Sequence, residues 1–204
     1  MNRVKKSSLI IFVALLSPIM AHAVPVTIDF ETGAPCCFVS TTPLTSLGGV
    51  TFTGVDGNGG SILDQSGNFG VNALSGTDFY AFNTTLGTGQ IVDLGFGGLI
   101  SSFSIFASAG RYGVNFLAEA FDSADVLLDS FAFNPLANEW GLLSLSGSGI
   151  NRVRLSFLGS SCCAVYDDLT YDTMVSVPEP GTLSLLGAGL LALGSMRRRR
   201  RRSP

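Results

Sequence analysis

The sequence predicts an all-β protein whose central part folds as an antiparallel β-sandwich, and three observations support this prediction. Between residues 24 and 175, β-rich segments are separated by Gly, Asn, Asp and Ser roughly every eight to twelve residues, which is typical of sandwiches and barrels. Apolar and polar residues alternate within these segments, as they do in strands with one buried face. The chain has 25 glycines, and no ten-residue stretch of this part has a helical period.

The expected strands follow one another along a single domain, residues 24–175. The alternation is clearest near its end, where Val153, Leu155 and Phe157 share one face of a strand and Arg152 and Arg154 share the other. No fixed-period repeat or linker divides the region. In chain order, the expected strands cover residues 26–30, 49–55, 78–83, 90–96, 101–109, 113–121, 125–133, 140–147, 151–159 and 164–172.

Residues 1–23 have the layout of a secretory signal peptide. Basic residues come first, the apolar run Leu9–Leu16 follows, and Ala21-His22-Ala23 forms an A-x-A cleavage pattern. We therefore expect export through the Sec machinery and cleavage after Ala23. The alternative is a buried N-terminal helix, which the three-part layout disfavours.

Composition excludes several function classes. Between Val24 and Val175 the chain has three arginines, no lysine and fourteen acidic residues, a formal net charge of −11, whereas the whole chain carries −3. Such an acidic domain is a poor partner for phosphate backbones, so we expect no nucleic-acid binding. The only histidine, His22, leaves with the signal peptide. The mature protein therefore lacks Ser-His-Asp triads, Cys-His pairs and histidine-bound zinc.

The four cysteines form two adjacent pairs, Cys36-Cys37 and Cys162-Cys163. An exported chain with four cysteines is expected to form disulfides, with three pairings possible. A bond between neighbours would strain the backbone, so we favour two bridges between the pairs, which would tie the first strand region to the last. The first such bridge is worth about 4–5 kcal/mol in the chain-entropy model. A four-thiolate metal site is the alternative, and adjacent cysteines fit its geometry poorly.

The C-terminal module, residues 176–204, combines three features in order. Pro178, Glu179 and Pro180 follow Val177, and an uncharged apolar run then extends to Met196. As a helix, the run from Leu183 spans roughly 21 Å, short of the ~30 Å hydrocarbon core, so residues 181–196 cross an inner membrane only marginally. Moving six charged arginines across the membrane costs too much free energy, so they should stay in the cytoplasm and act as a stop-transfer block. A core helix with a solvated basic tail, the alternative, does not explain this order. The arginines are Arg197, Arg198, Arg199, Arg200, Arg201 and Arg202.

This module resembles the PEP-CTERM sorting signal of Gram-negative bacteria. In that family a membrane enzyme, exosortase, handles the signal and is thought to cleave at or near the Pro-Glu-Pro. The resemblance implies transient anchoring in the inner membrane with a cytoplasmic C-terminus, and then a place on the cell surface or outside the cell. It covers only the 28 residues from Val177 onwards. Such proteins usually occur in producers of extracellular polysaccharide.

Many PEP-CTERM bodies look like lectin-type sandwiches, and the first and last expected strands here resemble those of carbohydrate-binding jelly rolls, which often lie side by side. The resemblance implies a non-catalytic sandwich that associates with exopolysaccharide. Asp29, Glu31, Asp167 and Asp168 could then supply oxygen ligands to a structural calcium. Calcium takes six to eight oxygens, so we favour ordinary edge and turn roles for these four acids.

Sugar binding would need exposed aromatic rings, and no motif selects the binding residues. Trp140 stands at a strand start, where it is more often a core or rim residue. One alternative is a glycoside hydrolase or lyase that uses two carboxylates, but no motif selects a pair, so we assign no catalytic residue. A coat that assembles through edge strands is another alternative. The aromatic candidates are Trp140, Tyr80, Tyr112, Tyr166 and Tyr171.

Overall fold

The computed structural model divides into two compact units, Ala23–Met174 and a terminal unit made of Met1–His22 and Val175–Pro204. In the terminal unit only Gly187, Gly189 and Leu190 are described, and they are helical. Among the described residues, no helix is long and apolar enough to span a membrane. The predicted signal peptide lies outside the described residues, and so does the predicted sorting helix apart from Gly187, Gly189 and Leu190. The described residues are 24–34, 43–54, 59–81, 90–111, 113–159, 164–174, 187 and 189–190.

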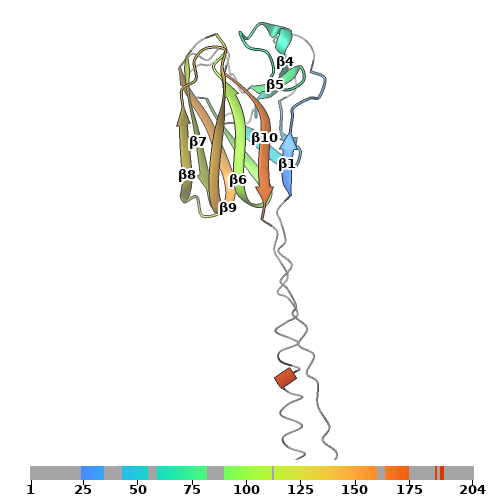
Figure 1. Cartoon of the computed structure of the whole chain (residues 1–204), viewed down its shortest axis with the longest axis vertical. Coiled ribbons are helices and arrows are strands. Elements are labelled where there is room, and N and C mark those ends of the chain that lie inside the picture. Colours follow the sequence, from blue (N-terminus) through green and yellow to red (C-terminus); the bar gives the residue numbers. More distant parts are fainter. Residues whose placement is uncertain are drawn as a thin grey trace, which may run out of the picture. The chain divides into compact units, whose positions relative to one another are not determined.

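In its described part, the central unit consists of antiparallel strands and one short 3-10 helix (Figure 1). Neighbouring strands pair antiparallel throughout its described part, which confirms the predicted all-β antiparallel fold. The elements are β1 (Pro25–Ile28), β2 (Ser46–Leu47), β3 (Val50–Gly54), β4 (Ser61–Asp64), η1 (Gln65–Gly67), β5 (Asp78–Ala81), β6 (Gln90–Ser108), β7 (Val114–Phe121), β8 (Leu127–Phe133), β9 (Trp140–Gly159) and β10 (Val165–Thr173).

Two long strands, β6 and β9, run through both halves of the sheet. Gln90–Gly95 of β6 pairs with Arg152–Phe157 of β9, and Ser102–Ser108 pairs with Trp140–Ser146. From the sequence we expected two shorter strands in each of these stretches, and this expectation was wrong. In β9 the chain passes through Gly149, whose φ of +86° suits glycine, and in β6 the register shifts between Gly95 and Ile100; neither irregularity ends its strand.

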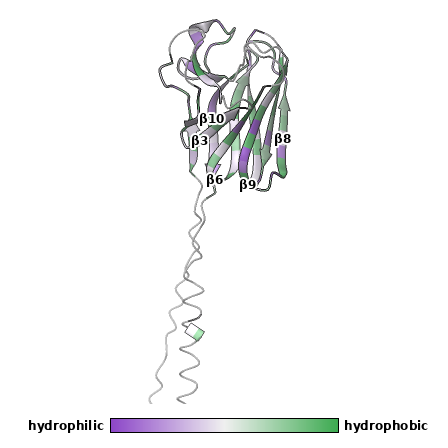
Figure 2. Ribbon diagram, turned by 180° about the vertical axis from the view of Figure 1, so that it is seen from behind, coloured by the Kyte–Doolittle hydropathy of each residue, from purple (hydrophilic) through white to green (hydrophobic). Residues whose placement is uncertain are grey.

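The two halves of the sheet fold onto one another around one main apolar core. One half adds β3, β7 and β8 to the long strands, and the other adds β10 with β1 and β5. Rings from the two halves touch: the centroids of Phe116 in β7 and Tyr166 in β10 lie 5.3 Å apart. Val153, Leu155 and Phe157 are buried, as the alternation predicted. Figure 2 shows hydrophobic and hydrophilic residues alternating along β9.

The first and last strands lie side by side, as the jelly-roll resemblance implied. β1 pairs with β10 from Pro25 opposite Asp172 to Ile28 opposite Leu169. All four cysteines lie outside the described residues, so their bridging stays a prediction. Ala164, which follows the second cysteine pair, belongs to the main core, and Ala34, which precedes the first, packs against that core.

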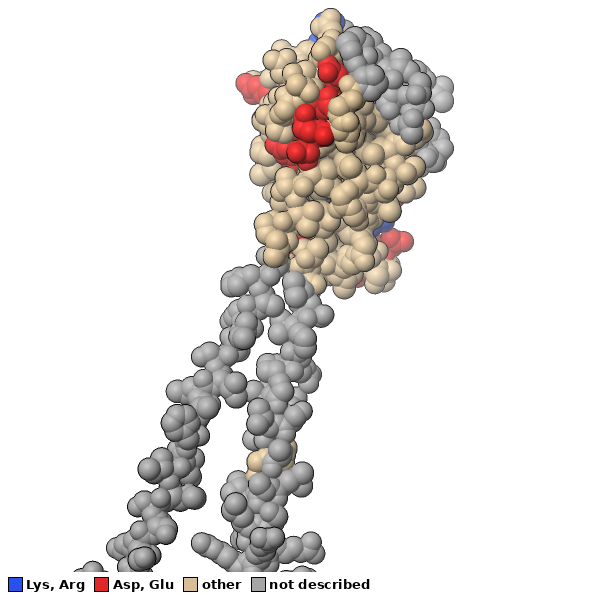
Figure 3. All heavy atoms as spheres, turned by 90° about the vertical axis from the view of Figure 1, so that its right-hand side faces the viewer, with Lys and Arg blue, Asp and Glu red and all other residues tan. Residues whose placement is uncertain are grey.

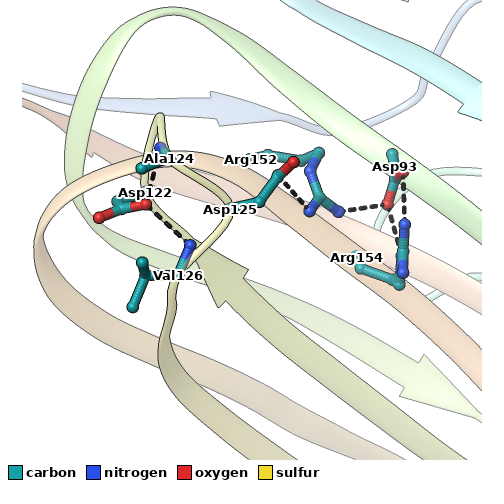
Figure 4. Close-up of polar contacts among 7 residues, drawn as sticks. All are labelled: Asp93, Asp122, Ala124, Asp125, Val126, Arg152 and Arg154. Atoms are coloured by element: carbon teal, nitrogen blue, oxygen red, sulfur yellow. Dashed lines mark hydrogen bonds and ion pairs between the residues drawn. The ribbon is translucent and has the colours of Figure 1, made fainter.

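An ion-pair cluster covers the outward face of β9 (Figure 4). Arg154 donates to both oxygens of Asp93 at 2.8 and 3.0 Å, and Arg152 donates to Asp93 at 2.9 Å and to Asp125 at 2.8 Å. Partial burial opposes ionisation of Asp93, but the two guanidinium groups outweigh it and hold the pKa of Asp93 below its ordinary value. The Arg152 guanidinium also lies 4.1 Å from the centroid of the Phe121 ring. Both arginines are thus neutralised by acids.

Candidate functional site

The connection between β4 and β5 forms a structure of its own, and we call residues 65–77 the cap loop (Figure 1). Beneath it lies a second, smaller apolar cluster that is separate from the main core. Phe69 from the cap loop meets Phe79 of β5 edge to face, with ring centroids 5.1 Å apart. Trp140, the first residue of β9, packs against this cluster. The complete set of buried members is Leu63, Phe69, Phe79, Ala81 and Val165.

The cap loop is held chiefly by side chains that bind its backbone. Asp64 caps η1 by accepting from the Ser66 amide at 2.7 Å, a typical N-cap contact. The Gln65 side chain accepts from the Ala73 amide at 2.8 Å and so joins the two arms of the loop. The Trp140 indole donates to the Asn72 carbonyl at 3.1 Å. These contacts satisfy polar backbone groups that have no strand partner.

Asp167 and Asp168 of β10 accept hydrogen bonds from the same turn of the cap loop. Asp167 accepts from the amides of Leu74 and Ser75 at 2.8 and 3.2 Å, and Asp168 accepts from the Ser75 hydroxyl at 2.8 Å. Adjacent residues of a regular strand point to opposite faces. Here Asp168 has a φ of +45° and the register with β6 shifts between Asp167 and Thr170, so this bulge lets both carboxylates reach the loop.

Burial raises the pKa of Asp167 to about 6. The side chain is fully buried, which disfavours its charged form, and the negative charge of Asp168 acts in the same direction. The amides of Ser75, Leu74 and Asp168 favour the charged form but only partly offset the burial. Asp167 is therefore the described carboxyl group that titrates closest to neutral pH, among those with a resolved shift.

Glu31 holds the end of the cap loop. One of its carboxylate oxygens accepts from the amides of Thr77 and Asp78 at 3.0 and 2.9 Å. The carboxylate also lies directly against Gly76, where a Cβ would collide with it, and Gly76 has a φ of +55°. Glycine is needed at this position for both reasons.

The four acids that were predicted as calcium ligands therefore bind protein groups. Glu31, Asp167 and Asp168 hold the cap loop, and Asp29 accepts from the Glu31 amide at 3.2 Å. No group of three or more acidic side chains in the described part of the chain is placed to hold a metal ion. The side of the unit on which β1 lies carries a patch of Asp and Glu side chains (Figure 3). Calcium binding by these four acids stays a hypothesis that the described contacts do not test.

An open hollow lies between the cap loop and the start of β9, with a volume of about 870 Å³. This is within the usual size range of small-ligand sites. Its apolar part comes from Trp140, which is half-buried, and from Phe69 beneath it. Its polar part comes from Ser66 and from four residues with side-chain amides, Gln65, Asn68, Asn72 and Asn138. The lining residues are Gln65, Ser66, Asn68, Phe69, Gly70, Val71, Asn72, Ala73, Leu74, Asn138 and Trp140, and none of them is charged.

Two residues join the rim of the hollow to the turn that follows β6. The Asn138 side-chain amide donates to the carbonyls of Gly70 and Gly110, and its backbone amide donates to Gly110 at 2.9 Å. Arg111 donates to the Asn68 side chain at 2.6 Å, and its stem covers Gly70, where a Cβ would lie 2.6 Å from the Arg111 Cγ. Arg111 and Asn138 thus fix the position of Asn68 and Gly70.

Of the four aromatic candidates that the structure describes, Trp140 alone lines this hollow. Tyr80 and Tyr166 are fully buried and Tyr171 is buried, so these three belong to the main core. Tyr112 lies outside the described residues. No sequence motif points to the amide residues that line the hollow, because the fold alone brings Asn68 and Asn138 to the same place.

The PEP-CTERM protein-sorting motif family matches residues 176–201. The chain carries a PEP-CTERM sorting motif. This confirms the resemblance drawn from the Pro-Glu-Pro, the apolar run and the arginines. The motif implies export, exosortase-mediated processing and a membrane-anchored sorting tail. Its residues, Val177–Pro180 and Arg197–Arg202, lie outside the described part of the structure. No curated protein sequence matches the chain.

Several solved structures are similar to this chain. The K2 cleaved adhesin domain of Lys-gingipain has a TM-score of 0.51 at 14% identity, over 74% of this chain and 100% of that domain. This similarity concerns the fold alone. TmCBM61, solved with β-1,4-galactotriose, has a TM-score of 0.38 at 15% identity, over 71% of this chain and 90% of that one. The CBM22-1–GH10 modules of Clostridium thermocellum endo-1,4-β-D-xylanase 10B were solved with xylohexaose. They have a TM-score of 0.40 at 16% identity, over 76% of this chain and 29% of that one.

Proposed function

We propose that the protein is an exported, exosortase-sorted surface or matrix protein that associates with exopolysaccharide through a non-catalytic, lectin-like jelly-roll sandwich. The sorting motif supports the export and surface location. The observation that carries the polysaccharide association is the hollow at the cap loop. It combines one half-buried indole with four residues that carry side-chain amides, and the apolar faces of sugar rings stack on aromatic rings while their hydroxyls bond to amides.

The chemistry of the lining supports binding without catalysis. Glycoside hydrolysis uses a pair of carboxylates on either side of the scissile bond. The hollow is lined by amides, a hydroxyl, glycine and apolar groups, and no carboxylate is among its lining residues. One oxygen of the buried Asp167 accepts from the cap-loop amides of Leu74 and Ser75, and the other accepts from the amide of Asp168 in β10, which supports a structural role for Asp167.

Co-sedimentation of the full-length chain, purified in detergent, with the producer's exopolysaccharide tests this proposal. We expect the wild type to sediment with the polymer and Trp140→Ala to remain in the supernatant. Trp140→Phe keeps a ring and should retain part of the binding. Leu158→Ala is the matched control, because this exposed apolar side chain lies outside the hollow and should not affect binding. Absence of binding by the wild type would refute the association.

The same assay separates the two alternatives. Sedimentation of the protein without polymer would indicate self-assembly, for which the exposed Leu127 and Phe131 on β8 offer an apolar surface. Release of reducing sugar from the polymer would indicate an enzyme.

A further inference from the structure

We infer that the hollow binds carboxylated polysaccharides, with Arg111 holding the carboxylate of a uronic-acid residue. This inference rests on the proposed sugar-binding role of the hollow and names the class of polymer. The basic side chains of the central unit are the first observation that supports it. Three described residues of this unit are basic, and two of them, Arg152 and Arg154, are bound to Asp93.

Arg111 is the third, and its situation differs from theirs. It is exposed, and none of the described acids forms an ion pair with it. Its guanidinium is nonetheless fixed in place. One terminal nitrogen donates to Asn68, and the stem lies over Gly70, both of which line the hollow. An exposed arginine normally moves among many rotamers, and anchoring of this kind reduces the entropy lost on binding.

The remaining donors of Arg111 suit a carboxylate. A guanidinium has five N–H donors in a planar fork, and the described contacts use one of its nitrogens. The fork matches the two oxygens of a carboxylate, and such charge-assisted pairs are short and strong. A uronic-acid residue would place its carboxylate on Arg111 while a neighbouring ring stacks on Trp140 and its hydroxyls meet Gln65 and Asn138.

The acidic charge of the unit does not prevent this. At physiological ionic strength, charges more than about 8 Å apart are largely screened, so contacts at the hollow decide affinity. The exposed Glu139 stands in sequence between Asn138 and Trp140 without lining the hollow. Its repulsion should weaken acidic ligands somewhat, and it provides a second way to test the sign of the charge effect.

Binding of full-length chain in detergent to a set of commercial polymers tests the inference. The probes are polygalacturonate and alginate as carboxylated polymers, dextran and galactan as neutral ones, and dextran sulfate as a sulfated one. We expect the carboxylated polymers to bind at least tenfold more tightly than the neutral ones. Arg111→Gln should weaken carboxylate binding severalfold and leave neutral binding within about twofold of the wild type. Attraction to Arg197–Arg202 is common to every variant and cancels from this comparison. Glu139→Gln should strengthen carboxylate binding.

Arg152→Gln is the matched control, because it removes the same charge outside the hollow and should leave carboxylate binding within about twofold. An equal loss of carboxylate binding in Arg152→Gln, or an equal loss of dextran sulfate binding in Arg111→Gln, would overturn the inference by showing general attraction to anions. Binding of neutral polymers without any effect of Arg111→Gln would overturn it while leaving the sugar-binding role intact. If no polymer binds, including the producer's own, both the inference and the proposed function fail.

Discussion

The main core and the cap loop belong to one unit but are stabilised by different interactions. The main core buries alternating apolar side chains from the two halves of the sheet, and its members are nearly all fully buried. The cap loop buries a small cluster around Phe69 and relies on side chains that bind its backbone. Apolar burial is cooperative and insensitive to pH, whereas the carboxylates that hold the loop respond to protons. The difference indicates a stable sheet that carries a less stable loop at the proposed binding site.

Deleting a large side chain from the main core should have the largest effect on stability. Phe116 is buried between the two halves and contacts the rings of Phe157 and Tyr166. Phe116→Ala should lower the free energy of unfolding by about 3–5 kcal/mol through lost burial and a residual cavity. Urea denaturation followed by tryptophan fluorescence and circular dichroism measures this. Phe131→Ala on the exposed side of β8 is the control, and an equal loss there would contradict the assignment of the core.

Asp167 should give the cap loop a pH dependence that the main core lacks. Its pKa of about 6 lies above the unfolded value near 3.8, so the folded state takes up a proton. The associated stability is fully present below pH 4 and is lost as the pH rises through 6. The loss amounts to about 2–3 kcal/mol by pH 7, at 1.36 kcal/mol for each pKa unit. Urea denaturation of the wild type and Asp167→Asn at pH 4, 5, 6 and 7 measures it.

The difference in unfolding free energy between the wild type and Asp167→Asn at each pH separates the effect of Asp167 from that of the other acids. Asp93 acts in the opposite direction, because its lowered pKa gives stability that is lost only as the pH falls below its ordinary range. An unchanged slope between pH 4 and 6 in Asp167→Asn would show that another group titrates there.

Removing Glu31 should loosen the end of the cap loop without unfolding the sheet. Glu31→Ala leaves the amides of Thr77 and Asp78 to water, and we expect a loss of about 1 kcal/mol because the carboxylate is exposed. Hydrogen exchange should accelerate in residues 74–78 and stay unchanged in β7. Uniform acceleration across the unit would mean that the cap loop unfolds only together with the core.

Calcium should have the smallest effect. The carboxylates of Glu31, Asp167 and Asp168 already bind protein groups, so we expect the melting temperature in excess calcium and in EDTA to agree within about 1 °C. Differential scanning fluorimetry provides the comparison, with magnesium as the control cation. A rise of several degrees with calcium alone would support the metal site that the acid pattern allowed.

The sequence predicted the strands because their alternation is local and has a period of two. Val153, Leu155 and Phe157 could be assigned to the buried face without any knowledge of their partners. The sorting motif could also be recognised from the sequence, because the Pro-Glu-Pro, the apolar run and the arginines follow one another in the chain. The glycine-rich stretches in β6 and β9 were misread as breaks, since the same residues serve turns and bends and only strand pairing distinguishes the two.

The sequence by itself thus determined the all-β fold, the acidic charge and the sorting motif, all of which depend on composition or on neighbouring residues. Only the tertiary structure decided the site. Arg111 meets Asn68 across 43 positions, and Asp167 meets Leu74 across 93. The bulge at Asp168 turned two adjacent acids toward one loop, where a regular strand would have separated them. Contacts of this kind depend on how distant strands are registered, and no local pattern encodes that register.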